Sequence, residues 1–169
     1  YGRLCYECGL LPSTRFCAVT GRDLISEYVG GTAEKTNRLI LDSLGGTLFI
    51  DEAYTLALSS HGEEAVGQLV NDLEVYKGQF AVVIAGYEDQ IDRLFAMNEG
   101  LASRFPNVVR TEDFTAEELR RLFDLGVRER GGGFTVGEDL KNAEEDLFGT
   151  MYASRRSDFG NGRTVNELI

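Results

Sequence analysis

Histidine is almost absent from this sequence, and its scarcity narrows the chemistry open to the protein. His61 is the single histidine among 169 residues, which removes most histidine-based catalysis and most zinc sites from consideration. Cysteine is also scarce, and an odd count of three favours reduced thiols in a reducing compartment over a disulfide framework. Cys5 and Cys8 form a C-x-x-C pair without a second pair to complete a metal site. We therefore expect both thiols to be small buried side chains on one helix face.

Positive charge and long apolar segments are under-represented as well. Lys and Arg number 17 against 28 Asp and Glu, and the resulting net charge of −11 repels the phosphates of a nucleic-acid backbone. No apolar run approaches the ~20 residues of a membrane-spanning helix. The 43% hydrophobic and 27% charged residues are typical of a globular protein. The length fits one domain, or one domain with a small appendage.

The most informative stretch is 46–54, where an apolar run ends in two adjacent carboxylates, Asp51 and Glu52. The apolar residues predict a short strand that is buried on both faces. Open α/β sheets bind ligands at the carboxyl ends of their strands, so the pair would lie where a ligand binds. Asp51 suits Mg²⁺, a hard cation that prefers carboxylate oxygen, and Glu52 could orient an attacking water as a general base. The alternative is an acidic pair that only solvates the following turn.

Strand and helix patterns alternate along the larger, N-terminal part of the sequence. We expect helices over 1–9 and 32–43, around 66–73 and through Leu94 and Phe95, strands over 15–20, 79–85 and 107–110, and a tight corner over 100–106. The strand over 79–85 reads as fully buried. This alternation predicts an α/β fold with a parallel sheet covered by helices.

No segment after Asp113 has the sequence pattern of a strand. Thr115 and Glu118 form a capping box that opens a helix. Beyond Gly131–Gly133, a second helix is expected over 138–152, with Leu140, Leu147 and Met151 facing inward, and a third helix begins near Arg163. We therefore divide the chain into a core over 1–113 and a small all-helical unit over 114–169. Neither terminus carries a helix-ending signal, so further residues are expected beyond both ends.

Several of these segments agree in order and spacing with a known family. The segments are 24–36, 46–54, 84–89, 98–105 and 160–163. Together they resemble an AAA+ ATPase, of the branch that contains the red-type Rubisco activase, stage V sporulation protein K and the type VII secretion ATPases. The resemblance covers essentially the whole chain and implies a P-loop NTPase core followed by a helical lid.

The resemblance assigns roles at the end of each central strand. Asp51 and Glu52 match the Walker B metal ligand and catalytic base. Tyr87 and Glu88 follow the second buried strand, where the family places its sensor-1 polar residue, and either of the two could act. The position departs from the asparagine that is common elsewhere in AAA+ proteins, and a simple turn at the strand end is the alternative.

Two arginines and an aromatic loop are assigned in the same way. Arg104 matches the arginine finger that reaches the ATP of a neighbouring subunit, and Arg163 matches the sensor-2 arginine of the lid. The alternatives are a helix-end arginine for Arg104 and a surface salt bridge for Arg163. Tyr28 and Val29 match the first pore loop, which grips an extended polypeptide, whereas a Tyr28 folded back onto the sheet is the alternative.

One family motif is absent from these residues: the glycine-rich loop that ends in Lys-Ser or Lys-Thr and cradles the phosphates. In the family it precedes the helix expected over 1–9, so we expect it upstream of residue 1 and expect these residues alone to be inactive.

The implied protein binds and hydrolyses ATP with Mg²⁺, forms a homo-oligomeric ring, most simply a hexamer, and remodels a protein client in the cytoplasm or the plastid stroma. The alternatives are a degenerate, non-catalytic AAA+ scaffold and a clamp-loader-like DNA machine. The acidic balance of the sequence and Tyr28 speak against the DNA machine.

Overall fold

The computed structural model describes residues 2–130, 137–155 and 159–169. It divides into two compact units, unit 1 (Tyr1–Val108) and unit 2 (Val109–Ile169), each with its own hydrophobic cluster. Residues 105–115 carry neither helix nor strand and are exposed along nearly all their length. The boundary at 108/109 and the boundary drawn from the sequence at 113/114 both fall inside this extended segment.

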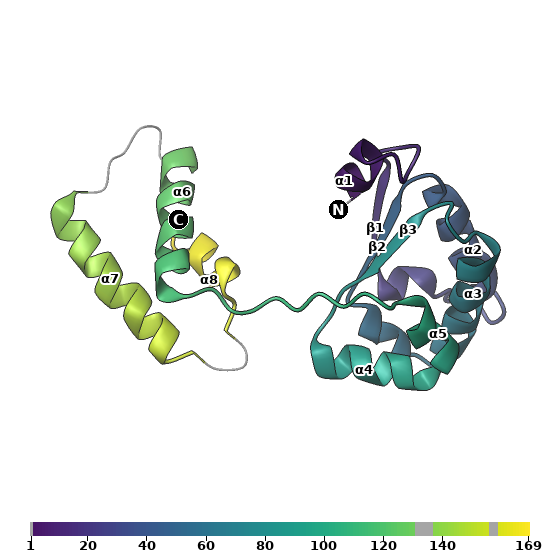
Figure 1. The fold of residues 1–169 in the computed structure, drawn as a ribbon. Helices are drawn as coiled ribbons and strands as arrows, with labels where there is room; N and C mark the ends of the chain where they lie inside the picture. The colour runs from purple at the N-terminus through teal and green to yellow at the C-terminus, as the bar shows by residue number, and fades with distance from the viewer. Residues whose placement is uncertain (1, 131–136, 156–158) are drawn as a thin grey trace. The chain divides into compact units, whose positions relative to one another are not determined.

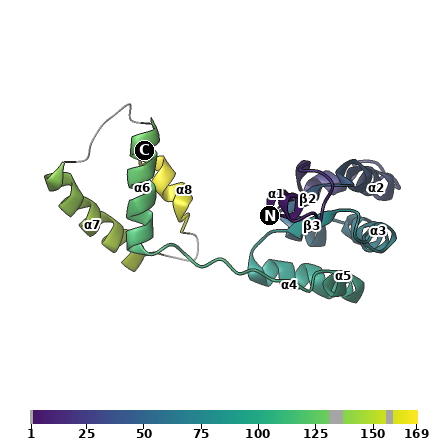
Figure 2. The same cartoon turned by 45° about the horizontal axis from the view of Figure 1, so that its top comes forward.

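Unit 1 is built on a parallel three-stranded sheet in the order β1-β2-β3. Its strands and crossover helices are β1 (Phe16–Thr20), α2 (Thr32–Ser43), β2 (Thr47–Asp51), α3 (Gly62–Val75) and β3 (Ala81–Ile84). Figures 1 and 2 show α2 and α3 side by side. The register pairs Thr20 with Asp51 and Ile50 with Ile84, so the strands end at one carboxyl edge. The predicted helix-covered parallel sheet is confirmed.

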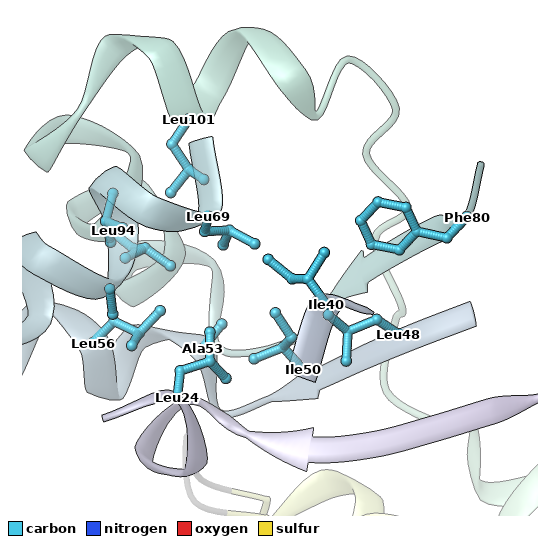
Figure 3. Packing of buried hydrophobic residues seen from close by; sticks show 12 residues of the cluster. Leu24, Ile40, Leu48, Ile50, Ala53, Leu56, Leu69, Phe80, Leu94 and Leu101 are labelled. Atoms are coloured by element: carbon cyan, nitrogen blue, oxygen red, sulfur yellow. The ribbon is translucent and has the colours of Figure 1, made fainter. Parts of the chain in front are cut away.

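The helices cover one face of this sheet more completely than the other. Leu48 and Ile50 of β2 are fully buried in a cluster that includes Leu69 of α3 (Figure 3). On the opposite face, Phe16 is largely exposed and stacks on Phe49 with ring centroids 6.0 Å apart. The prediction that the strand over 79–85 is fully buried was wrong: every residue of β3 is only partly buried, because β3 is an edge strand of the described sheet.

The remaining elements of unit 1 are α1 (Gly2–Glu7), the 3₁₀ helices η1 (Gly21–Leu24) and η2 (Ala53–Leu58), α4 (Glu88–Met97) and α5 (Glu99–Arg104). The corner predicted over 100–106 is largely this last helix. The side chain of Asn98 caps it by accepting a 3.2 Å hydrogen bond from the amide of Leu101, whose buried side chain fixes the helix in the core.

The strand predicted over 107–110 is not formed. Val108 and Val109 are exposed, and the described residues contain no neighbouring strand that pairs with this segment. A β-branched sequence becomes a strand only where another strand satisfies its backbone, so local propensity overstated the structure here.

The three cysteines are all free, as the odd count predicted. Cys5 is buried in α1, but Cys8 is exposed, so the expectation that both thiols are buried was wrong. Cys8 lies in the exposed turn that follows α1, although its amide still donates to the carbonyl of Leu4 at 2.9 Å. These two thiols therefore do not act as a packed pair.

Unit 2 is helical, with α6 (Ala116–Arg130), α7 (Glu138–Ala153) and α8 (Gly162–Glu167). Among its described hydrophobic residues, Leu119, Phe148 and Val165 are fully buried. Leu147 was predicted to face inward but is 45% exposed, because the buried stripe of α7 runs through Glu144, Phe148 and the partly buried Met151.

The capping box is confirmed at the start of α6. The amide and hydroxyl of Thr115 donate to the Glu118 carboxylate at 2.8 and 2.9 Å, and the Glu118 amide donates back to the Thr115 hydroxyl at 3.3 Å. The predicted break at Gly131–Gly133 and the side chain of Leu140 lie outside the described residues. Across the residues that the structure describes, no helix is long and apolar enough to cross a membrane.

Candidate functional site

An acidic edge forms where β2 and β3 end. The amide of Ala85 donates to the carbonyl of Ile50 at 2.9 Å, and the amide of Ala53 donates to the carbonyl of Ala85 at 3.1 Å. These bonds hold the turn after β2 against the end of β3. Asp51 ends β2 and Glu52 begins that turn, and both residues are exposed, so the pair is anchored through its backbone and presents its carboxylates to solvent.

Glu52 has an uncommon backbone conformation for a residue with a side chain. Its φ is 46° and its ψ is 39°, in the left-handed region that is unfavourable for a non-glycine residue by about 1–2 kcal/mol. Two contacts hold it there: its amide donates to Oδ1 of Asp51 at 2.8 Å, and its carbonyl accepts from the hydroxyl of Thr55 at 2.8 Å. Strain of this kind concentrates at functional sites, and it sets the direction in which Glu52 leaves the sheet.

Glycine at position 21 makes room for this turn. Gly21 is buried at the start of η1, and a Cβ atom there would stand 3.0 Å from the carbonyl oxygen of Glu52 and 3.2 Å from the Cα of Ala53. Backbone atoms cannot swing away as a long side chain can, so a larger residue would push the acidic turn outward. No pattern in the sequence marks Gly21 as part of the site, because the contact joins segments that are far apart in the chain.

The two sensor-1 candidates lie at the same edge. Tyr87 is exposed and directly precedes α4. The centroid of its ring lies 6.3 Å from that of Tyr54, which belongs to η2, the 3₁₀ helix that follows Glu52. Glu88 is the first residue of α4 and is also exposed. The fold thus brings Asp51, Glu52 and both sensor-1 candidates to one edge, and an aromatic contact links Tyr87 to the acidic turn.

The donor set at this edge suits a magnesium nucleotide. Asp51 offers an exposed carboxylate, the oxygen ligand that Mg²⁺ prefers. The described residues contain no group of three or more His, Cys, Asp and Glu side chains placed to hold a metal together. The Asp51 carboxylate fits an ion held by one or two protein carboxylates and by phosphate oxygens, the usual arrangement for Mg²⁺ with a nucleotide.

The Tyr28 loop lies between η1 and α2. The amide of Tyr28 donates to the hydroxyl of Ser26 at 3.1 Å, and the amide of Gly31 donates to the carbonyl of Tyr28 at 3.1 Å. Gly30 has a φ of 79°, which closes the turn. Tyr28 and Val29 are 80% and 91% exposed, so the ring is not folded back onto the sheet. The loop has an ordered base and a solvent-facing apolar tip.

Arg104 is the last residue of α5, and its side chain is folded onto its own unit. Nη1 donates to the carbonyl of Gly100 at 2.9 Å, and Nη2 donates to Oε2 of Glu74 at 3.3 Å. Its Nε is buried and has no hydrogen-bond partner among the described residues. Glu74 lies at the end of α3, and no local pattern in the sequence links it to Arg104.

Arg163 lies in unit 2, in the first turn of α8, with its side chain exposed. The preceding Asn161 was not singled out in the sequence analysis. Its side-chain amide donates to Asp113 at 2.6 Å, and its side-chain oxygen accepts from the amide of Phe114 at 2.9 Å. Asn161 thus fixes the start of α8 to the segment that enters unit 2, which orients the helix that carries Arg163.

Comparisons with known proteins agree with this geometry. The family model described as the ATPase family associated with various cellular activities (AAA) matches residues 3–112. Stage V sporulation protein K of Bacillus subtilis is 34% identical over 172 residues, covering 99% of this chain and 53% of that protein. The chloroplastic ribulose bisphosphate carboxylase/oxygenase activase of Cyanidioschyzon merolae is 33% identical over 171 residues, covering 97% of this chain and 56% of that protein.

The ESX-1 secretion system protein EccA1 of Mycobacterium tuberculosis is 33% identical over 171 residues, covering 95% of this chain and 30% of that protein. The chain spans about half the length of the first two of these relatives. The family model covers unit 1 almost entirely, including the acidic edge, the Tyr28 loop and Arg104. By this match and by its fold, the chain belongs to the AAA family of ATPases.

Proposed function

We propose that this chain is the ATP-hydrolysing core and helical lid of a ring-forming AAA+ ATPase that remodels a protein client. The observation that carries the proposal is the exposed Asp51–Glu52 pair at the carboxyl edge of a parallel sheet, with Glu52 held in a strained left-handed conformation. Non-glycine residues in this region are uncommon and concentrate at functional sites, which favours a functional pair over one that only solvates a turn. The fold and the family match support the same site.

The roles at the acidic edge follow from the chemistry of its side chains. Asp51 would hold Mg²⁺, which when bound would neutralise charge on the phosphate oxygens. Glu52, which is exposed at this edge, accepts a proton from the attacking water. Tyr87 or Glu88 provides the sensor-1 polar group, and the contact between the rings of Tyr87 and Tyr54 favours Tyr87.

Chain topology favours an Arg104 that acts on a neighbouring subunit. α3 leaves the carboxyl edge of the sheet after β2 and returns to the amino edge before β3. Glu74 lies next to the last residue of α3, so Arg104 beside it belongs to the end of unit 1 away from its own Asp51 and Glu52. A residue that completes a site on another copy makes a head-to-tail contact, and such contacts close into rings. We propose a hexamer from the resemblance to the family.

The Tyr28 loop would contact the client. Tyr28 and Val29 form an exposed apolar tip on an ordered base, which suits non-specific grip on an extended polypeptide. One relative is by its name an activase of ribulose bisphosphate carboxylase/oxygenase, a protein. We propose a protein client here as well, in a reducing compartment that suits three free thiols. Arg163, with its planar guanidinium, would be the sensor-2 arginine of the lid.

The test of hydrolysis is Glu52→Gln in the full-length protein. Glutamine keeps the size and hydrogen bonding of glutamate but removes the base, so ATP should bind while turnover falls by about 100-fold or more. The control is Glu63→Gln, which neutralises another exposed carboxylate, in the first turn of α3, and should leave turnover unchanged. Wild-type turnover in Glu52→Gln would refute the proposed base.

The test of action between subunits is a mixing experiment. Arg104→Ala rings should be inactive, and so should Glu52→Gln rings. In a mixed ring, an Arg104→Ala subunit keeps its own Glu52 and can receive Arg104 from a Glu52→Gln neighbour, so part of the activity should return. If mixing restores nothing, a finger that crosses the subunit boundary is not supported.

A further inference from the structure

Arg104 is proposed to act on a neighbouring subunit, yet its guanidinium is hydrogen-bonded within its own unit. Its guanidinium donates through Nη1 to the Gly100 carbonyl and the Ser103 hydroxyl, and through Nη2 to the Glu74 carboxylate, while Nε is buried without a partner in the described residues. Guanidinium donates through all of its nitrogens, and a buried donor without an acceptor is unfavourable. This conformation therefore leaves part of the hydrogen-bonding capacity of Arg104 unused.

The surroundings of Arg104 attract anions. A cavity of about 440 Å³ lies beside it, and its lining includes Lys77, Ser103 and Pro106 as well as Glu74. The two cations, Arg104 and Lys77, outnumber the single carboxylate. Glu74 is thus the only acidic side chain in the described lining, and it occupies an N–H edge of the guanidinium that an incoming anion would use.

We propose that Glu74 is a positioning residue for Arg104: its carboxylate holds the guanidinium on its own subunit and releases it to a phosphate group of the neighbouring subunit's nucleotide. This inference rests on the proposed function. The Glu74 side chain is 62% exposed and that of Arg104 is 27% exposed, with 3.3 Å between Nη2 and Oε2. A pair this open to water is weak, so it biases the position of Arg104 without locking it.

Phosphate is the anion that can displace Glu74. It carries more negative charge than a carboxylate and offers several acceptor oxygens, so it can engage the guanidinium at two nitrogens at once, including the Nε that has no acceptor now. Glu74 and a phosphate therefore compete for the same donors. Before the neighbouring nucleotide arrives, Glu74 keeps Arg104 paired and in a defined place.

The test is the chemical modification of Arg104 in the nucleotide-free, full-length protein. Phenylglyoxal reacts with guanidinium groups, and mass spectrometry reports the rate at each arginine. The ratio of the Arg104 rate to the rate at Arg38, an exposed reference on α2, should rise about two- to threefold in Glu74→Ala. Glu74→Gln should give a smaller rise, since the amide oxygen still accepts a hydrogen bond, and Glu63→Gln in the same helix should give none.

A purely structural role for Glu74 would behave differently. Loss of a helix-stabilising residue would lower the melting temperature and leave the Arg104 to Arg38 ratio unchanged, and that result would overturn the proposal while leaving the arginine finger in place. Glu74→Ala should also lower KM for ATP by about two- to threefold at nearly constant kcat, because a ground-state competitor has been removed. If Arg104→Ala rings hydrolyse ATP at the wild-type rate, the finger itself is wrong, and this proposal falls with it.

Discussion

The described hydrophobic core of unit 1 is much larger than that of unit 2. Unit 1 buries a continuous cluster that links the sheet to α2, α3, α4 and both 3₁₀ helices, whereas unit 2 fully buries only Leu119, Phe148 and Val165 among its described hydrophobic residues. The candidate residues of unit 1 lie on the rim of its large core. Residues on the rim of unit 1 can therefore be replaced without loss of its fold, whereas each buried residue of the small core of unit 2 contributes a large share of that unit's stability.

The largest effect expected from this difference is at Phe148, which is fully buried and packs against Phe123 with ring centroids 5.7 Å apart. Phe148→Ala should lower the free energy of unfolding by about 3–5 kcal/mol, a large share of what so small a unit possesses. Hydrogen–deuterium exchange should show lost protection over 109–169 and retained protection over 1–108. Leu147→Ala, at the adjacent exposed position, is the control. Equal loss of protection in both units would show that they unfold as one.

Alanine substitutions at glycines in the two units should change the free energy of unfolding by intermediate amounts. A Cβ at Gly62, at the start of α3, would overlap the carbonyl oxygen of Leu56, so Gly62→Ala should destabilise unit 1 by about 1–3 kcal/mol. Gly67 in α3 and Gly149 in α7 have no atom within 4 Å of such a Cβ, and alanine there should stabilise by about 0.5–1 kcal/mol because it favours helix. Urea unfolding measures all three. A stable Gly62→Ala would mean that η2 shifts freely.

Tyr28 tests whether the rim of unit 1 is independent of its core. Tyr28→Ala should change the free energy of unfolding by no more than about 0.5 kcal/mol, as is usual for exposed residues. Leu24→Ala, four positions earlier and fully buried, should destabilise by about 2–5 kcal/mol. In the full-length protein, Tyr28→Ala should keep basal ATP hydrolysis and lose client remodelling. A large drop in melting temperature would instead assign Tyr28 to the core.

The smallest expected effect concerns an arrangement that occurs in both units, a threonine whose amide and hydroxyl donate to the carboxylate three residues later. The Thr20 amide, and then its hydroxyl, lower the pKa of Asp23 in unit 1, and the Thr115 amide and hydroxyl lower the pKa of Glu118 in unit 2. Because each pKa is lower in the folded state, each carboxylate stabilises the fold at pH values above its unfolded-state pKa. This stabilisation is lost as the pH falls through the folded-state pKa, which lies below the ordinary values of 3.8 for Asp23 and 4.5 for Glu118.

Carboxyl NMR titration measures both of these pKa values. Thr20→Val and Thr115→Val each remove the hydroxyl donor and keep the amide, so each should raise the pKa of its partner, Asp23 or Glu118, part of the way to its ordinary value. The melting temperatures of the two variants should move only slightly, because both carboxylates are solvent-exposed. An unchanged pKa in either variant would assign the shift to the amide alone.

Much of this protein could be predicted from local sequence because local rules govern those parts. The α2 helix, the acidic end of β2 and the capping box at Thr115 follow from hydrophobic periodicity and from side chains that bond to their own backbone. The exposure of Tyr28 follows from the glycines and polar residues around it. In each case the deciding interactions lie within a few residues of one another.

Tertiary structure alone decided the features that join distant segments. Glu52 adopts its left-handed conformation because Gly21, Thr55 and the end of β3 close around it. Arg104 meets Glu74 across 30 residues of sequence. Residues 107–110 have strand propensity but no strand to pair with in the described structure. Propensity and periodicity describe a residue's own segment, whereas these outcomes depend on which backbone or charge another segment brings beside it.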